Sequence, residues 1–239
     1  MEKSDARNYR VKLLYEMRYG QYASSNRLPR ETELAEMLHI SRTQLRDVLS
    51  ELEREGYITR RHGVGTIINH HVLQVKNRMD IEVEFLDVIR NCGYTPEMVS
   101  EEVWESEADE HIAEKLQIPQ GTPVWCKRSV CTADGNPAIC WMDVVDKGLI
   151  KKECSVECFK TIIFQFLQEY CEVSSYMDLT ELHAVAADEQ LAEALRVPIG
   201  TPLLNMEEVD FDIEGKPIFY SGQYFVDGVI QQTVLRKKL

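Results

Sequence analysis

The 239-residue chain lacks any apolar run near the ~20 residues that a membrane-spanning helix needs. Its first stretch, MEKSDARNYRVKLL, is rich in charge and has no apolar segment, so we expect no secretory signal. The composition, 44% hydrophobic and 28% charged, is that of a water-soluble globular protein with one large domain or two ordinary ones. Together these features predict a cytoplasmic protein with no membrane partner.

Cysteine is absent from the first part of the chain, and the seven cysteines that follow have irregular spacing. They are Cys92, Cys126, Cys131, Cys140, Cys154, Cys158 and Cys171. An odd, irregular set in a chain without a secretory signal indicates reduced thiols and not a disulfide framework. Cys154 and Cys158 lie close in sequence, but no second pair with the spacing of a zinc site follows. We therefore expect no metal and no cofactor.

Basic residues are scarce, because 27 Lys and Arg face 40 Asp and Glu, for a formal net charge of −13. The imbalance is confined to one part of the chain. Residues 1–72 hold 12 Lys and Arg against 10 Asp and Glu, a net of +2, whereas residues 73–239 hold 15 against 30, a net of −15. Such asymmetry predicts two modules with different partners, of which only the first can approach a polyanion without strong repulsion.

The segment RLPRETELAEMLHISRTQLRDVLSELEREG predicts two helices joined by a tight turn. Each helix has an apolar face with helical period. The faces consist of Leu34, Ala35 and Leu38 in the first helix and of Leu45, Val48, Leu49 and Leu52 in the second. Ser41 is a candidate N-cap for the second helix, since Gln44 three residues on completes a capping box. Pro29 is compatible with the start of the first helix, and Gly56 ends the second.

The polar side chains at the start of the second helix suit DNA. Arg42 and Gln44 project from its first turn, while Thr43 and Arg46 lie opposite the apolar face. Guanidinium groups match guanine edges or phosphates, an amide matches adenine, and the free N–H groups of a helix start bind phosphate. A solvated amphipathic helix would look similar, so the next segment decides between the two.

That next segment, YITRRHGVGTII, predicts a short hairpin with Gly63 and Gly65 at its turn. Arg60, Arg61 and His62 lie at or near the tip, where they can reach the minor groove or the DNA backbone. Two helices with a capped second helix, followed by a basic hairpin, favour DNA binding over an ordinary surface helix.

The rest of the chain contains an internal repeat. AEKLQIPQGTPVW (113–125) reappears as AEALRVPIGTPLL (192–204), and each copy is followed by strands joined through a Gly-containing turn. Two further helices are expected, over Ile81–Asn91 and over residues 159–171, after a polar, extended connector at residues 73–80. The pattern predicts an α+β domain with an antiparallel sheet and pseudo-symmetric halves.

Residues 10–70 resemble the winged helix-turn-helix domain of GntR-type bacterial transcription regulators. The resemblance rests on LPRETELAEML (28–38), ISRTQLRDVLSELEREGYI (40–58) and RRHGVGTII (60–68), in the right order and spacing. It implies binding to double-stranded DNA through Thr32, Ser41, Arg42, Thr43, Gln44, Arg46, His62 and Gly63. We add Arg30, which is close enough to substitute for an arginine at position 32, and Arg61 near the tip of the hairpin. The family usually has arginine at the position of Thr32 and a small or β-branched residue at that of Gln44, so the operator sequence cannot be borrowed from relatives.

The repeat resembles the UTRA effector-sensing domain of the HutC-like branch of these regulators, which has a chorismate-lyase-like fold. The resemblance implies a homodimer that binds a pseudo-palindromic operator and a small-molecule effector in the C-terminal domain. We expect a winged helix-turn-helix domain at residues 1–72, a linker at 73–80 and the UTRA domain at 81–239. Repression is the expected sign, because most relatives of this kind repress.

The expected effector site departs from that of sugar-sensing relatives, which carry an Arg-x-Arg pair and a glutamate on two strands. The matching positions here are Ser129, Cys131 and Trp141, while Phe219 replaces a second glutamate. The resemblance adds Tyr224 and Asp227 from a closing Y…D element. Without two arginines a phosphate is badly paired, so we expect an effector that is not a phosphosugar but something flatter or more apolar, an aromatic compound or an acid. Trp141, Cys131 and Phe219 could also be core residues.

Two other functions remain open from the residues. An enzyme is disfavoured, because the chain has no metal motif, nucleophile elbow or phosphate loop. A thiol- or metal-responsive regulator would use Cys126, Cys131 and Cys140, although Cys126 and Cys131 are five residues apart and so point to opposite faces of a regular strand.

Overall fold

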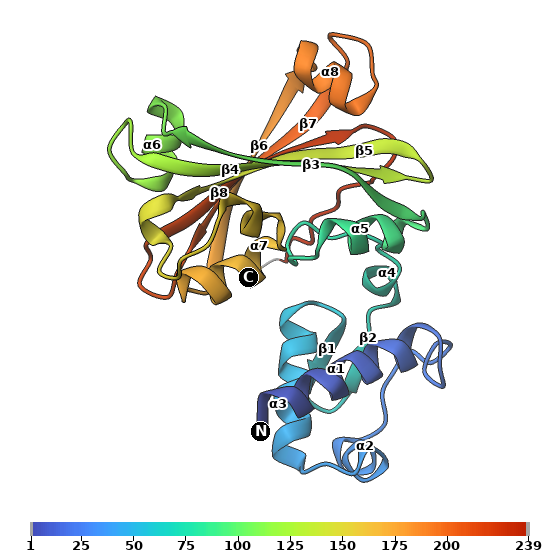
Figure 1. Cartoon of the computed structure of the whole chain (residues 1–239). Helices are drawn as coiled ribbons and strands as arrows, with labels where there is room; N and C mark the ends of the chain where they lie inside the picture. The colour runs from blue at the N-terminus through green and yellow to red at the C-terminus, as the bar shows by residue number, and fades with distance from the viewer. Residues whose placement is uncertain (1, 238–239) are drawn as a thin grey trace. The chain divides into compact units, whose positions relative to one another are not determined.

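Figure 1 shows the computed structural model, which describes residues 2–237. The outermost positions of the two predicted domains, Met1 and residues 238–239, lie outside the described residues. The chain forms two units. Unit 1 contains the residues up to Glu82 together with the segment from Gln232 onward, and unit 2 is Val83–Gln231. The C-terminal segment therefore groups with unit 1, whereas the sequence assigned it to the second domain.

Unit 1 is a helical domain with a two-stranded hairpin. Its elements are α1 (Glu2–Arg18), α2 (Glu31–Leu38), α3 (Arg42–Arg54), β1 (Ile58–Arg61), β2 (Gly65–Ile68) and α4 (His70–Leu73). The two apolar faces expected from the sequence are buried, and they pack with Leu13 and Met17 of α1 in one core. The predicted helix-turn-helix and the hairpin that follows it are confirmed.

The turn between α2 and α3 has the local features that the sequence indicated. His39 ends α2 in the left-handed conformation, with φ of 54°. Ser41 accepts a hydrogen bond from the backbone N–H of Gln44, and the Gln44 side chain accepts one from the backbone of Ser41. The predicted capping box is confirmed, and it fixes the start of α3.

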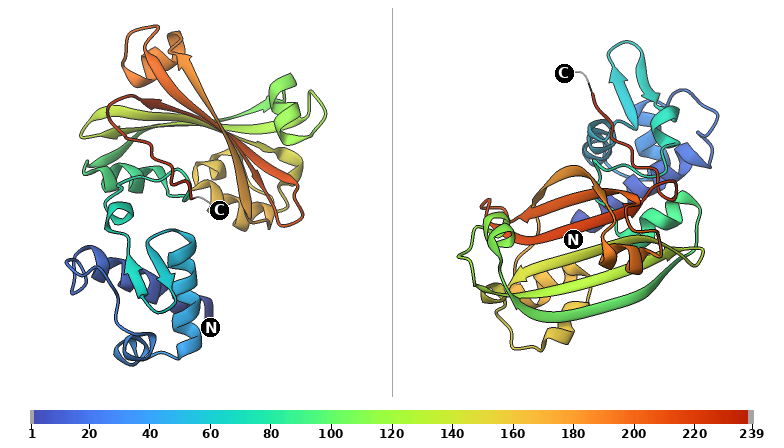
Figure 2. Two further views of the ribbon diagram at one scale, coloured as in Figure 1. Left: turned by 180° about the vertical axis from the view of Figure 1, so that it is seen from behind. Right: turned by 90° about the horizontal axis from the view of Figure 1, so that it is seen from above.

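Unit 2 is built around one six-stranded antiparallel sheet. The twisted sheet can be followed in both views of Figure 2. The strands are β3 (Pro96–Glu107), β4 (Pro123–Ala133), β5 (Asn136–Asp146), β6 (Met177–Ala186), β7 (Pro202–Phe211) and β8 (Pro217–Val226). The α-helices are α5 (Phe85–Cys92), α6 (Glu110–Leu116), α7 (Ile163–Phe166) and α8 (Glu189–Leu195). Three further helical turns are η1 (Lys147–Leu149), η2 (Val156–Lys160) and η3 (Leu167–Cys171). In the described residues of this unit the strand order is β3-β4-β5-β8-β7-β6.

The sheet order shows the predicted internal repeat directly. The half β3-α6-β4-β5 and the half β6-α8-β7-β8 are related across the β5–β8 pair at the centre of the sheet. Even the caps repeat, because Asp109 accepts from Ile112 N and Asp188 accepts from Leu191 N, each at 2.8 Å. The expected pseudo-symmetric α+β architecture is confirmed.

Two helix boundaries expected from the sequence are wrong. The helix placed over Ile81–Asn91 begins at Phe85. The helix placed over residues 159–171 is broken: η2 ends at Lys160, Ile162 is extended, and α7 begins at Ile163 and continues into η3. Both errors lie at β-branched residues, whose restricted side chains lower helix propensity in a way that apolar periodicity does not register.

The two faces of the sheet have different covers. Helix α6 and β4, β5, β7 and β8 share one buried apolar cluster, and α8 shares another with β4, β5 and β7. The residues of η2, α7 and η3 pack with Trp125, Val145 and Phe219 on the other face. No helix in residues 2–237 is long and apolar enough to cross a membrane.

Candidate nucleic-acid interface and effector site

All ten residues that the sequence assigned to DNA contact have exposed side chains or, for Gly63, an exposed backbone. Three of them lie close together, because an open hollow between α2 and the start of α3 is lined by Thr32, Ser41 and Arg42. The hollow is completed by Ala35, Glu36, His39 and Ile40. The front of α3 therefore offers polar and cationic groups around the turn.

Gln44 has a double role at this front. Its Oε1 accepts hydrogen bonds from the backbone N–H of Ser41 at 3.1 Å and from Ser41 Oγ at 2.9 Å. These two bonds occupy the acceptor capacity of the amide oxygen, so only the Nε2 donors remain for DNA. Reading adenine with both amide atoms, as the sequence suggested, requires the capping box to open.

The arginines at this front differ in their availability. Arg46 Nε lies 2.9 Å from Glu31 Oε2, and 59% of the Arg46 side chain is exposed. Arg30, Arg42 and Arg61 have no ion-pair partner within the described part of the chain. These three guanidinium groups can therefore bind phosphates or bases without first breaking an internal pair.

Two arginines, Arg60 and Arg27, hold the hairpin near its tip. The Arg60 side chain is turned back onto α3, with Nε 2.7 Å from Glu53 Oε2. Arg27 Nη1 donates to the carbonyl of Val64 at 3.1 Å, directly behind the tip. This leaves Arg61, His62 and the Gly63 backbone exposed at the end of the wing. Arg27 was not among the predicted residues, and no local motif distinguishes it.

The six residues predicted for effector binding do not all lie together. Register across β4, β5 and β8 puts Ser129 opposite Trp141, with Cys131 on the same face. The Trp141 ring lies 4.7 Å from that of Phe85, and the Phe219 ring lies 5.9 Å from that of Phe164, so both face α5 and α7. All four are buried.

The other two predicted residues lie elsewhere. Tyr224 packs with Cys140 and Val130 on the α8 side of the sheet. Asp227 follows the last residue of β8 and is exposed. Trp141 pairs with Gln223, so Tyr224 points to the opposite face of the sheet, and this register between β5 and β8 was not available from the sequence.

One row of polar residues crosses five neighbouring strands on the same face as Ser129. This polar row consists of Lys127, Asp143, Ser221, Glu208 and Thr180. Lys127 Nζ lies 3.1 Å from Asp143 Oδ2, and each side chain is only 4% exposed. Ser221 Oγ donates to Asp143 Oδ1 at 2.8 Å. This row was not predicted from the sequence, although Lys127 and Ser129 are two residues apart on one strand and therefore share a face.

Burial favours the protonated form of the acidic groups on this face. Burial raises the pKa of Glu208 to about 8, and repulsion from Asp210 is the second cause of this rise. Burial likewise raises the pKa of the Glu84 and Glu101 carboxyls, although the positive charge of Lys127 opposes this rise. Ser129 Oγ is buried and has no hydrogen-bond partner among the described residues. The face is therefore rich in carboxyl groups and has one buried hydroxyl left to bind a ligand.

The three cysteines considered for a thiol- or metal-responsive regulator do not have reactive thiols. Cys126, Cys131 and Cys140 are buried, and burial raises the pKa of their thiols to about 11, 12 and 11. A thiol with so high a pKa is protonated at neutral pH and is a poor nucleophile and metal ligand. Burial thus works against the thiol- or metal-responsive alternative.

One set of side chains has the spacing of metal ligands. Glu181, His183 and Glu207 each place a ligand atom within 4.8 Å of the others. However, Lys115 Nζ lies 2.5 Å from Glu181 Oε2 and 3.1 Å from Glu207 Oε2. Its ammonium group pairs with both carboxylates, so the set is an ion-pair network of the protein itself.

Comparison with curated proteins gives relatives along most of the chain. A probable fructoselysine utilization operon transcriptional repressor of Escherichia coli K12 is 27% identical over 237 residues, which cover 96% of this chain and 93% of that protein. An HTH-type transcriptional regulator of Mycobacterium tuberculosis, Rv0792c, is 25% identical over 80% of this chain and 71% of its own. These relatives are regulators and not enzymes.

Solved structures share the fold. The possible transcriptional regulator YydK of Bacillus subtilis aligns over 97% of this chain and 99% of its own, with a TM-score of 0.77 and 18% identity. PhnF of Mycobacterium smegmatis aligns over the same shares with a TM-score of 0.57 and 18% identity. The family model for bacterial regulatory proteins of the gntR family matches residues 11–68, and that for the UTRA domain matches residues 91–227. The chain therefore belongs to the GntR family of transcriptional regulators and carries a UTRA domain.

Proposed function

We propose that the protein is a ligand-responsive repressor that binds a pseudo-palindromic operator as a homodimer. The observation that carries the proposal is the placement of Arg42 and Arg61 at the front of α3 and the tip of the wing, where both are exposed and have no ion-pair partner among residues 2–237. The name of the E. coli relative, a transcriptional repressor, supports the sign of regulation.

Charge supports this choice of DNA-binding surface. Residues 1–82 with 232–239 hold 17 Lys and Arg against 12 Asp and Glu, a net of +5. Residues 83–231 hold 10 against 28, a net of −18, which accounts for the total of −13. Phosphate attracts the first unit and repels the second, so DNA is bound by unit 1 alone.

The homodimer follows from the size of the recognition helix. With 13 residues, α3 is about 20 Å long and reads only a few base pairs. Specific binding of a long genome by so short an element needs a second copy on an adjacent half-site. The experiment is selection of duplexes from a random library by the full chain, followed by mass measurement of the complex. We expect an inverted repeat bound by two chains, and a single half-site bound by one chain would contradict the homodimer.

In this proposal, the effector is a compound without a phosphate group. It binds the sheet face that carries Trp141 and the polar row. Lys127 is the buried cation among the described residues of unit 2, and Asp143 already neutralises it. A phosphate dianion, or a carboxylate, would meet the carboxyl groups of Glu84, Glu101 and Glu208 instead of a guanidinium clamp. A flat, neutral or amine-bearing compound fits better, since it can stack on Trp141 and hydrogen-bond to Ser129.

A thermal-shift screen of the full chain tests the effector class. The panel compares sugar phosphates and aromatic acids with neutral and amine-bearing aromatic compounds. A ligand at ~100 times its Kd stabilises the folded state by roughly 2.7 kcal/mol, which raises Tm by a few degrees for a domain of this size. Hits among neutral or amine-bearing compounds, lost in Trp141→Ala, are expected. A sugar phosphate that raises Tm would contradict this part of the proposal.

A further inference from the structure

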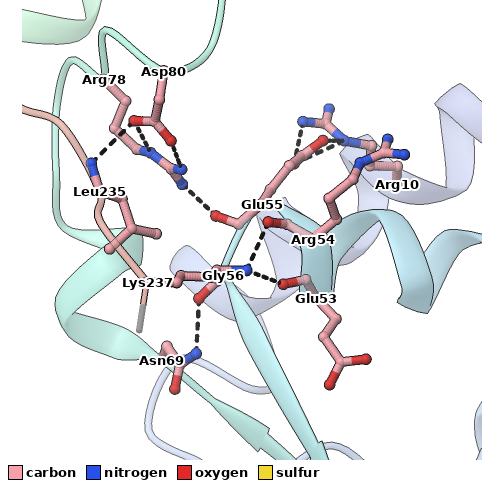
Figure 3. A network of polar contacts seen from close by, with 10 residues as sticks. All are labelled: Arg10, Glu53, Arg54, Glu55, Gly56, Asn69, Arg78, Asp80, Leu235 and Lys237. Carbon is pink, nitrogen blue, oxygen red and sulfur yellow. Dashed lines mark hydrogen bonds and ion pairs between the residues drawn. The ribbon is translucent and has the colours of Figure 1, made fainter. Parts of the chain in front are cut away.

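The C-terminal segment Gln232–Lys237 lies against the C-terminal end of α3, the helix whose front carries the candidate DNA contacts (Figure 3). Lys237 Nζ donates hydrogen bonds to the carbonyl oxygens of Glu53 at 2.6 Å and Arg54 at 2.7 Å. The last carbonyls of a helix have no partner within the helix, and the negative end of the helix dipole attracts a cation. The C-terminal end of α3 therefore binds the lysine side chain through its free carbonyl oxygens.

An apolar contact adds to these polar ones. Leu235 packs against the core of unit 1 and lies directly over Gly56. A Cβ atom at Gly56 would be only 2.5 Å from Leu235 Cδ2, so the absence of a side chain at Gly56 makes room for the leucine. Val234, the preceding residue, has 55% of its surface exposed. The segment therefore presents one side to the helix end and the other to solvent.

The segment also binds the part of the chain that links the two units. The backbone N–H of Met79 donates to the carbonyl of Thr233 at 2.8 Å, and the N–H of Leu235 donates to Asp80 Oδ1 at 3.2 Å. Arg78, ion-paired with Asp80, donates to the carbonyl of Glu55 at 2.6 Å. Both the linker and the C-terminal segment are therefore fastened to the same end of α3.

The wing is fastened there as well. Glu53 accepts from Lys237 through its backbone carbonyl. Its side-chain carboxylate accepts hydrogen bonds from the backbone N–H and from Nε of Arg60 in β1, each at 2.7 Å. Asn69, one residue after β2, donates to the carbonyl of Gly56 at 2.7 Å. Residues at the C-terminal end of α3 therefore hold both the C-terminal segment and the wing.

We propose that residues 232–237 are a second tether between the sensing unit and the DNA-binding unit. The chain enters unit 2 after Glu82 and leaves it after Gln231, which is five residues beyond the end of β8 at Val226. The central strand β8 carries Ser221 of the polar row, so the proposed ligand site and the end of α3 are joined by one short stretch of chain. The tether itself does not depend on the proposed function. Its role in regulation, which is to couple the ligand site on the sheet to DNA binding by α3, does rest on the proposed function.

The test compares two variants of the full chain. Leu235→Ser with Lys237→Ala removes the docking contacts, while Val234→Ser with Arg236→Ala changes the exposed side of the same segment. Probes at the exposed positions Lys12 of α1 and Glu193 of α8, introduced as non-natural amino acids, report the distribution of distances between the units by pulsed electron resonance. We expect a distribution at least twice as broad in the docking variant and unchanged in the control. Equal widths in both would overturn the tether.

Hydrogen exchange gives a second, local readout. The Met79 amide, bonded to the Thr233 carbonyl, should exchange at least tenfold faster in the docking variant and at the wild-type rate in the control. Unchanged exchange at Met79 overturns the docking. If exchange accelerates throughout α1 to α3, unit 1 has unfolded, and the milder Lys237→Met variant then replaces the double variant in both measurements.

The regulatory role is tested with a duplex selected by the wild-type protein. The docking variant should bind this duplex at least fivefold more weakly than the control variant, and equal affinity would overturn the regulatory step. Failure of the wild-type chain to select any duplex would contradict the proposed function, while the distance and exchange measurements would still decide the tether.

Discussion

At the scale of single residues, the buried ion pair of Lys127 and Asp143 in unit 2 carries a large desolvation cost. Removing two charges from water costs several kcal/mol, and only close contact and further hydrogen bonds offset this cost. The pair has these, since Lys127 also donates to the Thr161 carbonyl at 3.3 Å and Ser221 donates to Asp143. With both partners present, such a pair adds little net stability, because the cost of burying the charges offsets their attraction.

Removing one partner should therefore be costly. Lys127→Met leaves Asp143 buried without a counter-charge and is expected to lower the free energy of unfolding by about 3–5 kcal/mol. Arg128→Met is the matched control, because Arg128 and Glu102 form an exposed pair that contributes less than about 1 kcal/mol. Urea unfolding of the full chain measures both. A loss of similar size in the two variants would show that burial of the Lys127 pair does not matter.

Glu208 predicts a dependence of stability on pH. Its pKa is about 8 in the folded state and 4.5 in the unfolded reference, so the folded state holds a proton that the unfolded state releases between these values. Stability then falls as pH rises from 4.5 to about 8. Glu208→Gln should match the wild type near pH 4.5 and exceed it at pH 8 by on the order of a few kcal/mol. Parallel pH profiles of unfolding free energy for the two proteins would refute the assignment.

At the scale of elements, caps and repeats explain why some local structure was predictable. The capping box at Ser41 and the repeated motif before β4 and β7 are short-range signals, and the structure confirms both. The helix boundaries near Val83 and Ile162 were missed, because apolar spacing continues through β-branched residues that the helix does not include. The row from Lys127 to Thr180 depends on strand register, which short-range patterns do not contain.

The two repeated N-caps should contribute equally. Asp109 and Asp188 bond to the third backbone N–H of α6 and α8 at the same distance, 2.8 Å. Replacing either by alanine is expected to cost about 1 kcal/mol of unfolding free energy, whereas Asp→Asn should cost less, because asparagine also caps. Denaturant titration of the four single variants checks this. A cost confined to one half would show that the two halves do not share the capping geometry in solution.

At the scale of the whole molecule, the division into a basic and an acidic unit was visible in the sequence, but the path of the chain was not. Charge counts separate residues 1–72 from the rest. The return of residues 232–237 to the first unit depends on contacts with residues nearly two hundred positions away, such as Lys237 with Glu53, and no local pattern encodes them. The predicted effector residues likewise divide between the two faces of the sheet, because register decides their neighbours.

The central claim is that unit 1 binds duplex DNA through the front of α3 and the wing. The most direct measurement is fluorescence anisotropy of a selected duplex against salt concentration for the wild type, Arg42→Ala, Arg61→Ala and the control Arg128→Ala. The account predicts that Arg42→Ala and Arg61→Ala each weaken binding by roughly tenfold, and that each lost phosphate contact reduces the slope of log K against log salt by about one. Arg128→Ala should leave both quantities unchanged. Equal binding by all four proteins would contradict the claim.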